Sequence, residues 1–286
     1  MKKLGLALSG GGIRGIAHAG VLKALEENKI PIDVIGGTSS GSIISTLYAM
    51  GYSPYYIYIL FKRYSKELIE NNSKSMVTSI SNFMMNKKVR FSGFYSGEYI
   101  EKGFDEIALR KGIKKITDIK MPLVIPTVDI NDSKEYIFTN VVPEAEKSKD
   151  KYITDVNIGK AIRASSSFPV VFNPCIYKEH RFLDGGILNN IPADEVKKRG
   201  AEKVISVNFK ADDVTEESSV MDIAMRSIDI MGNKISEKNI NNSDMVLTIE
   251  TDKTGLLELE KLDKCYQYGY RQTIQNMDKI IELIDN

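Results

Sequence analysis

The chain has 286 residues, of which 42% are hydrophobic, so its length and composition permit a full globular core. Its 39 basic and 38 acidic residues leave a formal net charge of +1, which gives no global field for nucleic acid or an anionic membrane. Two cysteines, Cys175 and Cys265, are too few and too far apart for a disulfide framework or a zinc site, so a reducing compartment is the simplest interpretation.

At the N-terminus, Lys2 and Lys3 precede an apolar stretch, which is also the arrangement at the start of a secretory signal peptide. The unbroken apolar run covers only residues 4–8, which is too short for a signal-peptide core. No window approaches the roughly 20 apolar residues of a membrane-spanning helix. We therefore expect a cytoplasmic protein whose contact with membranes is at most peripheral.

Apolar runs that predict strands alternate along the chain with patterns that predict helices. In chain order, the first elements are a strand at 3–9, a helix at 14–28, a strand at 33–37 and a helix through 43–48. Further strands are predicted at 123–130, 135–139, 203–209 and 245–249, and further helices at 219–236 and 263–284. This alternation is typical of an α/β domain with a largely parallel sheet. Residues 129–135 predict a hairpin, so the sheet should be mixed.

Residues 48–104 hold more than half of the aromatic side chains, in helical stretches that are interrupted at residues 71–73. No linker sets them apart, so we predict one domain over residues 1–286 with a helical insertion that lies over the sheet. Two explanations of the aromatic residues stay open. They are ordinary core, or they form a mobile apolar lid that accepts acyl chains.

A glycine-rich turn, Gly10-x-Gly12-x-x-Gly15, ends the first strand and begins the first helix. This spacing matches the dinucleotide-binding pattern, which also needs an acidic residue near the end of the second strand. Asp33 stands at the start of that strand, so nucleotide binding is disfavoured. The same turn can direct backbone N–H groups and a helix N-terminus at an oxyanion. Arg14 lies in the first helical turn, where a surface salt bridge and a direct role in the site are both open.

The second strand leads into Gly37-Thr38-Ser39-Ser40-Gly41, which matches the nucleophile elbow of serine hydrolases. A sharp strand-to-helix turn lifts the serine hydroxyl out of the sheet, and the small flanking residues let the helix pass close to the strands. The N-terminal amides of the helix then face the reacting carbonyl. Centring the pattern on the next serine would put other residues at the glycine positions, so Ser39 is the predicted nucleophile.

A base for Ser39 must be found among few candidates, because the chain has only two histidines. His18 lies early in the first helix, where a packing or surface role is expected. His180 lies in a charged segment that predicts an exposed turn, and no histidine follows Asp184, where an elbow-type triad would place it. Asp184 follows an apolar pair and precedes two glycines, as though a strand delivers its carboxylate to the edge of the sheet. For the Asp-Gly motif in isolation, a tight turn would be the favoured explanation.

Four motifs, in this order, resemble those of the patatin-like phospholipases. They are Gly10–Gly15, Gly37–Gly41, Ala161–Pro169 with Phe172 and Pro174, and Asp184–Gly186 with Asn190 and Pro192. The match spans roughly residues 4–210, and residues 211–286 are predicted to form an α/β extension at the C-terminal end. The resemblance implies a three-layer α/β/α fold with a central, mostly parallel mixed sheet and a helical insertion over the site.

The resemblance also implies a catalytic dyad without histidine, in which Ser39 is acylated and Asp184 is the base. The amides around Gly11, Gly12 and Ile13 would form the oxyanion hole, supported by Arg14. The glycines that support these motifs are Gly10, Gly15, Gly37, Gly41, Gly185 and Gly186. Ser40 stands where the family often has alanine, which should not affect catalysis.

Members of this family hydrolyse acyl esters of phospholipids, lysophospholipids or neutral lipids, without a metal ion at the dyad. The predicted function is therefore a serine carboxylic-ester hydrolase in lipid degradation, with no cofactor and no nucleic-acid partner. Three alternatives stay open: an acyltransferase with the same acyl-enzyme, a catalytically silent lipid-binding protein, and a nucleotide-dependent enzyme.

Overall fold

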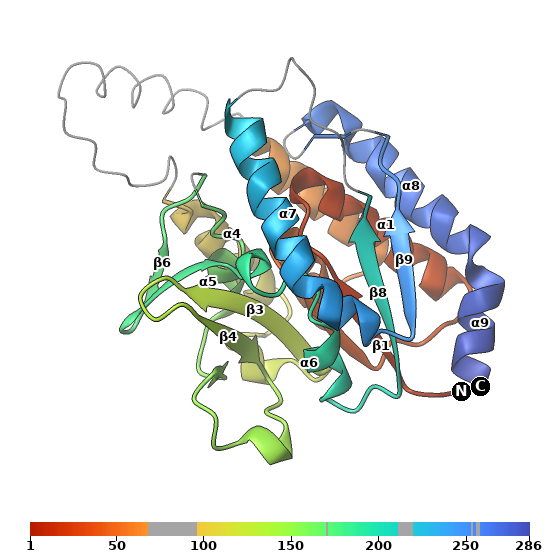
Figure 1. The fold of residues 1–286 in the computed structure, drawn as a ribbon, viewed down its shortest axis with the longest axis horizontal. Coiled ribbons are helices and arrows are strands. Elements are labelled where there is room, and N and C mark those ends of the chain that lie inside the picture. The colour runs from red at the N-terminus through yellow and green to blue at the C-terminus, as the bar shows by residue number, and fades with distance from the viewer. Residues whose placement is uncertain (68–95, 170, 211–219, 253, 256–257) are drawn as a thin grey trace.

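The computed structural model describes the chain except residues 68–95, 170, 211–219, 253 and 256–257. A twisted mixed sheet forms its centre, with the strand order β5-β4-β3-β2-β1-β8-β9, and a β6–β7 hairpin joins β3 through β7 (Figure 1). The strands are β1 (Leu4–Leu8), β2 (Val34–Gly37), β3 (Leu123–Asp129), β4 (Lys134–Thr139), β5 (Tyr152–Ile153), β6 (Cys175–Tyr177), β7 (His180–Asp184), β8 (Lys203–Phe209) and β9 (Met245–Ile249).

The middle of the sheet is parallel and one side is not. β1 pairs in parallel with β2 and β8, β2 pairs in parallel with β3, and β8 pairs in parallel with β9. β3 runs antiparallel to both β4 and β7, so the hairpin predicted at 129–135 is confirmed. The carboxyl ends of β1, β2 and β8 therefore lie at one edge of the sheet, and the loops that follow β1 and β2 meet there.

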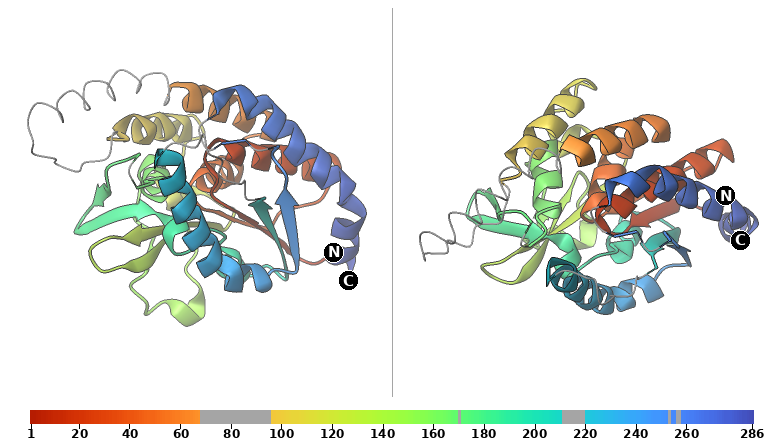
Figure 2. Two further views of the ribbon diagram at one scale, coloured as in Figure 1. Left: turned by 45° about the horizontal axis from the view of Figure 1, so that its top comes forward. Right: turned by 90° about the horizontal axis from the view of Figure 1, so that it is seen from above.

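Helices cover both faces of the sheet, as Figure 2 shows from above. The α-helices are α1 (Ile16–Glu27), α2 (Ser40–Ala49), α4 (Glu98–Leu109), α5 (Ile158–Ser165), α6 (Ala193–Lys197), α7 (Val220–Asn241), α8 (Leu262–Gln275) and α9 (Met277–Asp285). The short 3-10 helices are η1 (Gly12–Gly15), η2 (Ile116–Asp118), η3 (Glu144–Glu146), η4 (Gly185–Ile187) and η5 (Leu259–Lys261). The helices α1, α2, α4 and α8 lie on one face, and α7 lies on the other.

Alternate residues of β1 serve the two faces, as the two-residue period of a strand requires. Leu4, Leu6 and Leu8 belong to the larger apolar core, on the side of α1 and α2. Ala7 belongs to a smaller core on the opposite side, together with Val196 of α6. The sheet is therefore buried on both faces, which is the usual environment of a parallel sheet.

Most of the first helix is buried, because α8 lies against its outer surface. Two glycines make this contact possible. A Cβ added to Gly20 would lie 2.1 Å from the carbonyl oxygen of Tyr266, and one added to Gly269 would lie 2.0 Å from that of Ala17. The two helix backbones thus touch directly, and side chains at either glycine would push α8 away from the domain.

The predicted fold class is confirmed, and most predicted strands match the observed ones within two residues. The helix predicted at 263–284 is divided at Asn276 into α8 and α9. The helix predicted at 219–236 runs on to Asn241, while residue 219 lies outside the described residues. The short strands β5 and β6 were not predicted. In the described ranges, no helix is both long enough and apolar enough to cross a membrane.

The insertion predicted at 48–104 is described only in part. Residues 54–67 and α4 are helical, whereas 68–95 lie outside the described residues. Among the described aromatic side chains, Phe61 and Phe104 are buried, while Tyr55 and Tyr99 are exposed. Both explanations of these aromatic residues therefore stay open, and so does the prediction of a lid.

Candidate functional site

The glycine-rich turn and Ser39 lie side by side at the carboxyl edge of the sheet. Leu8 pairs with Gly37 at the ends of the parallel strands β1 and β2, so the two loops leave the sheet together. A Cβ built on Gly10 would lie only 3.1 Å from the Cβ of Ser39. The structure thus brings together two motifs that are separate in the sequence.

Ser39 adopts a backbone conformation that L-residues rarely take. Its φ is 54° and its ψ is −123°, and it is the N-cap residue immediately before α2. Such a conformation costs on the order of 1–3 kcal/mol and persists only where the surroundings enforce it. This geometry is that of a sharp strand-to-helix turn, which points the side chain away from the sheet.

The glycines that flank Ser39 are required by close approaches of the backbone. A Cβ on Gly41 would lie 2.5 Å from the carbonyl oxygen of Leu8, and one on Gly37 would lie 2.2 Å from the carbonyl oxygen of Gly41. The first turn of α2 therefore rests directly on the end of β1. A side chain at either position would move the helix and the serine with it.

The glycine-rich turn holds backbone donors beside Ser39. The N–H of Gly10 donates to Oδ1 of Asn190 at 3.0 Å. In the described part of the chain, the N–H groups of Gly11, Gly12 and Ile13 have no protein acceptor. Three neighbouring donors at the start of a helix can together receive a negatively charged oxygen.

Arg14 is buried, with 6% of its surface exposed, which is unusual for an arginine. Its Nε donates to the carbonyl oxygen of Gly11 at 3.2 Å, and its guanidinium lies 5.6 Å from the ring centre of Phe209. A Cβ on Gly11 would lie 2.5 Å from that same ring. Arg14 and Phe209 thus both contact the glycine-rich turn at Gly11. No pattern in the sequence predicted the contact of Phe209.

Asp184 ends β7 and is buried, with 2% of its surface exposed. Its Oδ1 accepts the N–H of Gly186 at 2.8 Å, which fixes the carboxylate over the first turn of η4. A Cβ on Gly185 would lie 2.3 Å from the carbonyl oxygen of Pro126 in β3. The strand predicted before Asp184 is present as β7. The neighbouring strand β3 leaves no room for a side chain at Gly185, the next residue.

Asn190 connects the Asp184 turn to the glycine-rich turn. A Cβ on Gly186 would lie 3.0 Å from Oδ1 of Asp184 and 3.2 Å from Oδ1 of Asn190. A Cβ on Gly10 would lie 2.7 Å from the same oxygen of Asn190. The amide of Asn190 therefore lies between both turns, so all three predicted segments meet at one place.

The serines at the end of α5 also reach this place. The N–H of Ser39 donates to Oγ of Ser165 at 3.1 Å, and Oγ of Ser166 donates to the carbonyl oxygen of Ser39 at 3.3 Å. The N–H of Asp184 donates to the carbonyl oxygen of Ser167 at 3.1 Å. The sequence marked these serines only as part of a motif, without a partner.

Neither histidine hydrogen-bonds to Ser39 or Asp184. His18 is fully buried, its Nε2 lies 2.9 Å from the carbonyl oxygen of Ser9, and burial lowers its pKa to about 4, so the ring is neutral. His180 begins β7 and its Nδ1 lies 2.6 Å from Oδ2 of Asp129. The predicted exposed turn is present at Lys178 and Glu179, but His180 follows it in β7, where its ring packs against aromatic side chains.

Asp33, the acidic residue considered for a nucleotide ribose, lies away from the glycine-rich turn. The carboxylate of Asp33 accepts the N–H of Leu4 at 2.8 Å, at the opposite end of β1 from the glycine-rich turn, so it cannot reach a ribose bound there. Among the described residues, no three histidine, cysteine, aspartate or glutamate side chains gather as a metal-binding group.

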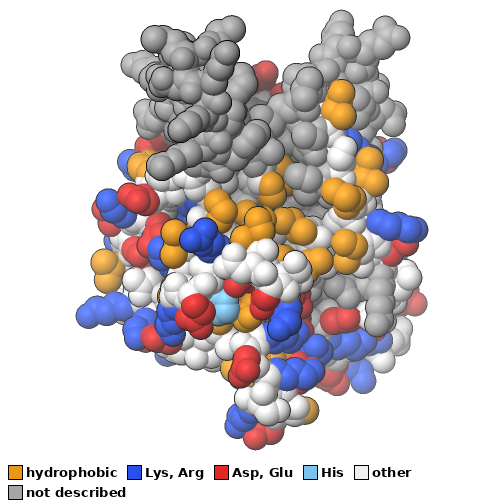
Figure 3. Space-filling model, turned by 60° about the vertical axis from the view of Figure 1, so that its left-hand side comes forward, with side chains coloured by type: hydrophobic (Ala, Val, Ile, Leu, Met, Phe, Trp, Pro, Cys, Tyr) orange, Lys and Arg blue, Asp and Glu red, His pale blue; other side chains and the backbone are white. Residues whose placement is uncertain are grey.

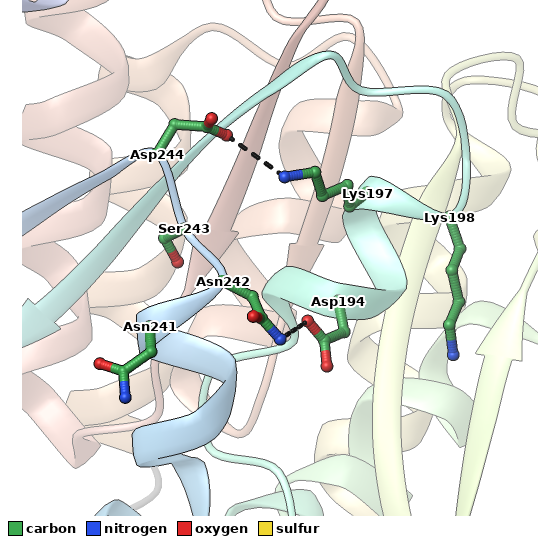
Figure 4. A pocket seen from close by; sticks show the side chains of 7 residues that line it. All are labelled: Asp194, Lys197, Lys198, Asn241, Asn242, Ser243 and Asp244. Carbon is green, nitrogen blue, oxygen red and sulfur yellow. Dashed lines mark hydrogen bonds and ion pairs between the residues drawn. The ribbon is translucent and has the colours of Figure 1, made fainter.

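A hollow of about 600 Å³ lies at the amino edge of the sheet, where β8 and β9 begin (Figure 4). Its lining residues are Asp194, Lys197, Lys198, Asn241, Asn242, Ser243 and Asp244. Lys197 and Asp244 point toward each other at 3.8 Å, and Asn242 donates to Asp194 at 2.8 Å. This hollow is separated from Ser39 by the length of the parallel strands.

Apolar side chains gather on the face that Figure 3 shows. On that side of the domain, Tyr99 of α4 and Ile176 of β6 are 45% and 64% exposed. The helix α7, which crosses over η4, also exposes Ile223, Ile230 and Ile235. The site therefore lies among elements that present apolar surface to the surroundings.

Comparisons with known proteins place the chain in a family. A sequence model of one family, described as patatin-like phospholipase, matches residues 6–197. Lysophospholipase NTE1 of Scheffersomyces stipitis is 29% identical over 93% of this chain and 17% of its own length. Patatin-like phospholipase domain-containing protein 6 of Mus musculus is 31% identical over 77% of this chain and 14% of its own length. This chain thus spans less than one fifth of the length of these relatives.

Solved structures share the fold at low sequence identity. VipD from Legionella pneumophila has a TM-score of 0.51 at 15% identity, over 97% of this chain and 67% of that chain. A chain of the ExoU–SpcU complex of Pseudomonas aeruginosa has a TM-score of 0.53 at 16% identity, over 97% of this chain and 52% of that chain.

Proposed function

The chain belongs to the patatin-like phospholipase family, and on that premise we propose that it is a lipid acyl hydrolase that works through Ser39 and Asp184. The observation that carries this proposal is the strained Ser39 beside three N–H groups that lack an acceptor in the described residues. Positive φ at a serine and unused donors beside it are both costly, and a nucleophile with an oxyanion site explains both.

In the proposed reaction, Oγ of Ser39 attacks the carbonyl carbon of an acyl ester and its proton passes to the carboxylate of Asp184. The carbonyl oxygen becomes an anion, which the N–H groups of Gly11, Gly12 and Ile13 receive. Asp184 then gives the proton to the departing alcohol oxygen as the ester C–O bond breaks. An acyl group remains on Ser39.

Water completes the cycle by the same route. Its oxygen attacks the acyl carbon while one of its protons passes to Asp184, and the same N–H groups receive the second oxyanion. The bond to Oγ of Ser39 then breaks, Asp184 returns the proton to Oγ, and a fatty acid leaves. An alcohol in place of water would give acyl transfer, so the product mixture distinguishes the two outcomes.

We infer that the substrate is a phospholipid or lysophospholipid. The relatives described above carry the names lysophospholipase and phospholipase, and apolar side chains are exposed on elements around the site. Contact with a membrane through the 48–104 segment is part of this proposal, and Tyr55, Tyr56 and Tyr99 are exposed aromatic residues in its described part. These rings have the amphipathic character that suits a lipid–water boundary.

The test compares wild type, Ser39→Ala and Asp184→Asn on lysophospholipid, diacyl phospholipid and p-nitrophenyl esters. We expect kcat to fall by about 10⁴-fold or more in Ser39→Ala and by about 10³-fold in Asp184→Asn. A fluorophosphonate probe should label Ser39 in the wild type, which peptide mass spectrometry can locate.

Asp129→Asn is the matched control, because Asp129 is equally buried but hydrogen-bonds to His180 instead of the site. It should keep wild-type activity. Undiminished hydrolysis by Ser39→Ala would exclude the proposed nucleophile, and undiminished hydrolysis by Asp184→Asn would exclude the proposed base.

A further inference from the structure

The strained backbone of Ser39 needs an external support, and α5 supplies one. The peptide N–H of Ser39 donates to Oγ of Ser165 at 3.1 Å, and its carbonyl oxygen accepts from Oγ of Ser166 at 3.3 Å. The two hydroxyls therefore hold the peptide groups on both sides of the Ser39 Cα. A residue whose φ is 54° is kept in that conformation only by contacts of this kind.

The next residue of the same segment holds the other half of the site. The carbonyl oxygen of Ser167 accepts the N–H of Asp184 at 3.1 Å. Three consecutive residues thus bind the backbone of Ser39 and the backbone of Asp184. The distance between nucleophile and base is therefore set through one short stretch of chain.

This stretch is itself anchored away from the site. Arg163 is 2% exposed, and its guanidinium donates to the carbonyl oxygens of Ser96 and Asn173, at 2.7 Å and 2.6 Å, and to Oγ of Ser167. Oγ of Ser167 in turn donates to the carbonyl oxygen of Arg163 at 2.7 Å. These bonds fix the end of α5 without any contribution from Ser39.

We propose that Ser165 and Ser166 are positioning residues that hold the Ser39 backbone in its reactive conformation, while the Ser167 carbonyl holds Asp184 at the matching position. This inference rests on the proposed function and adds residues that do not touch the reacting atoms. Ser165 has the larger part. It supplies the acceptor seen for the Ser39 N–H, whereas the Ser39 carbonyl oxygen also accepts from the N–H and Oγ of Ser42, at 2.9 Å and 2.6 Å.

The chemistry of a small hydroxyl suits this position. Ser165 is fully buried, so a larger side chain would not fit and a methyl group would leave the Ser39 N–H buried without an acceptor. In Ser165→Ala we expect the Ser39 peptide to relax toward an ordinary φ. Displacement of a catalytic group by about 1 Å can cost about 10²-fold in rate.

The first experiment measures kcat, KM and the rate of fluorophosphonate labelling for Ser165→Ala with a p-nitrophenyl ester. We expect kcat and the labelling rate to fall together by about ten- to a hundredfold, with KM within about twofold of wild type. Ser166→Ala should lose less, and Ser166→Thr, which keeps the hydroxyl, should recover wild-type kcat.

Ser206→Ala is the matched control. Ser206 is also fully buried and its hydroxyl also makes one hydrogen bond, to Oγ of Ser243 at 2.6 Å, far from Ser39. If Ser165→Ala loses no more kcat than this control, the inference is overturned. If Ser165→Ala does not fold, the pair Ser166→Ala and Ser166→Thr decides, and equal kcat in these two would overturn it.

A second measurement does not depend on activity. Amide hydrogen exchange at Ser39, followed by NMR in the wild type and in both alanine variants, reports the hydrogen bond to Ser165 directly. Exchange should be at least about tenfold faster in Ser165→Ala and unchanged in Ser206→Ala. Faster exchange in a protein whose Ser39 is never labelled would overturn the proposed function alone, and unchanged exchange would overturn the positioning role alone.

Discussion

The two edges of the sheet treat polar groups in opposite ways. At the amino edge, the hollow is lined by charged and amide side chains that bind one another, such as Lys197 with Asp244 and Asn242 with Asp194 (Figure 4). At the carboxyl edge, the backbone donors of Gly11 and its neighbours have no acceptor in the described residues. The number of polar groups around a hollow therefore does not by itself indicate a ligand-binding site.

The difference comes from what each edge uses to fix its geometry. At the amino edge, ion pairs and hydrogen bonds between side chains fix the geometry. The donors and acceptors that a ligand would need are therefore already paired. The carboxyl edge uses glycines, whose close backbone approaches fix the loops without side-chain partners, as Gly41 does against Leu8. Preorganised donors that are not already paired are what electrostatic catalysis requires.

The largest effect we expect comes from Gly41→Ala, because the new Cβ would meet the carbonyl oxygens of Leu8 and Ser9 at 2.5 and 2.6 Å. Overpacking of this kind should lower the free energy of unfolding by about 3 kcal/mol. Displacement of Ser39 should also lower kcat by about 10²-fold. Urea denaturation and steady-state kinetics measure the two losses.

Gly255→Ala is the matched control, because its added Cβ would meet only the Glu258 side chain at an ordinary 3.4 Å. It should change neither quantity appreciably. Wild-type stability and activity in Gly41→Ala would show that the backbone contact between α2 and β1 is dispensable.

Acid should act on the two edges in different pH windows. His18, behind the carboxyl edge, is held neutral because burial lowers its pKa to about 4. Between pH 6.5 and 4 the unfolded chain binds a proton there and the folded chain does not, so the free energy of unfolding should fall by about 3 kcal/mol as the pH falls. Denaturation at several pH values should show this slope in the wild type and not in His18→Gln.

Glu195 of α6 has a lower pKa than His18. Burial raises its pKa, but hydrogen bonds from Lys151 and Lys198 and the nearby positive charges outweigh burial and bring it to about 2. Its contribution to stability is present above its ordinary pKa of 4.5 and is lost as the pH falls toward 2. His18→Gln should therefore leave this lower window intact. If the slope between pH 6.5 and 4 persists in His18→Gln, another group is responsible.

A smaller effect is expected from Ser39→Gly, and its sign is opposite. Glycine takes positive φ at no steric cost, so the free energy of unfolding of this variant should exceed that of wild type by about 1 kcal/mol. The variant should also lose activity, because it lacks the hydroxyl. Ser39→Ala keeps the β-carbon and should show no such gain. Calorimetry of the three proteins gives the comparison, and equal stability of the glycine and alanine variants would mean that Ser39 is not strained.

The smallest effect is expected at the amino edge. Lys197→Ala removes the 3.8 Å pair with Asp244, in which the lysine side chain is 48% exposed. Exposed pairs contribute between about 0 and 1 kcal/mol, so stability should change by less than about 0.5 kcal/mol, with kcat unchanged. A loss of activity in this variant would give the hollow a part in turnover and remove the contrast between the two edges.

Local patterns in the sequence predicted the parts of the site that depend on strand ends. The turn at Gly10–Gly15, the Ser39 turn and the strand before Asp184 all follow from apolar runs that stop at small residues, and each was found where predicted. His180 was assigned to an exposed turn because its charged neighbours dominate the local pattern. Its ring is instead packed in the hairpin through a bond to Asp129, a residue far away in the sequence.

Contacts between distant segments could not be predicted in this way. Ser165 and Phe209 touch Ser39 and Gly11 because α5 and β8 are placed by the whole sheet, and no periodicity encodes that placement. The same holds for Gly20 and Gly269, whose isolated positions in helical patterns gave no sign that they form one helix–helix contact. Strand positions follow from local pattern, whereas partners across the sheet follow from topology.

The position of β1 between β2 and β8 has a consequence for the order in which the domain folds. One neighbour of β1 is only about 30 residues away in the chain, but the other, β8, begins at residue 203. The chain must lose the entropy of closing this long loop before the hydrogen bonds between β1 and β8 can form, which slows folding. On the ribosome, the Ser39 turn and β1 would emerge long before β8, with one edge of β1 unpaired and prone to aggregation until then. Chaperones that shield exposed strand edges should therefore matter most for nascent chains that end before residue 203.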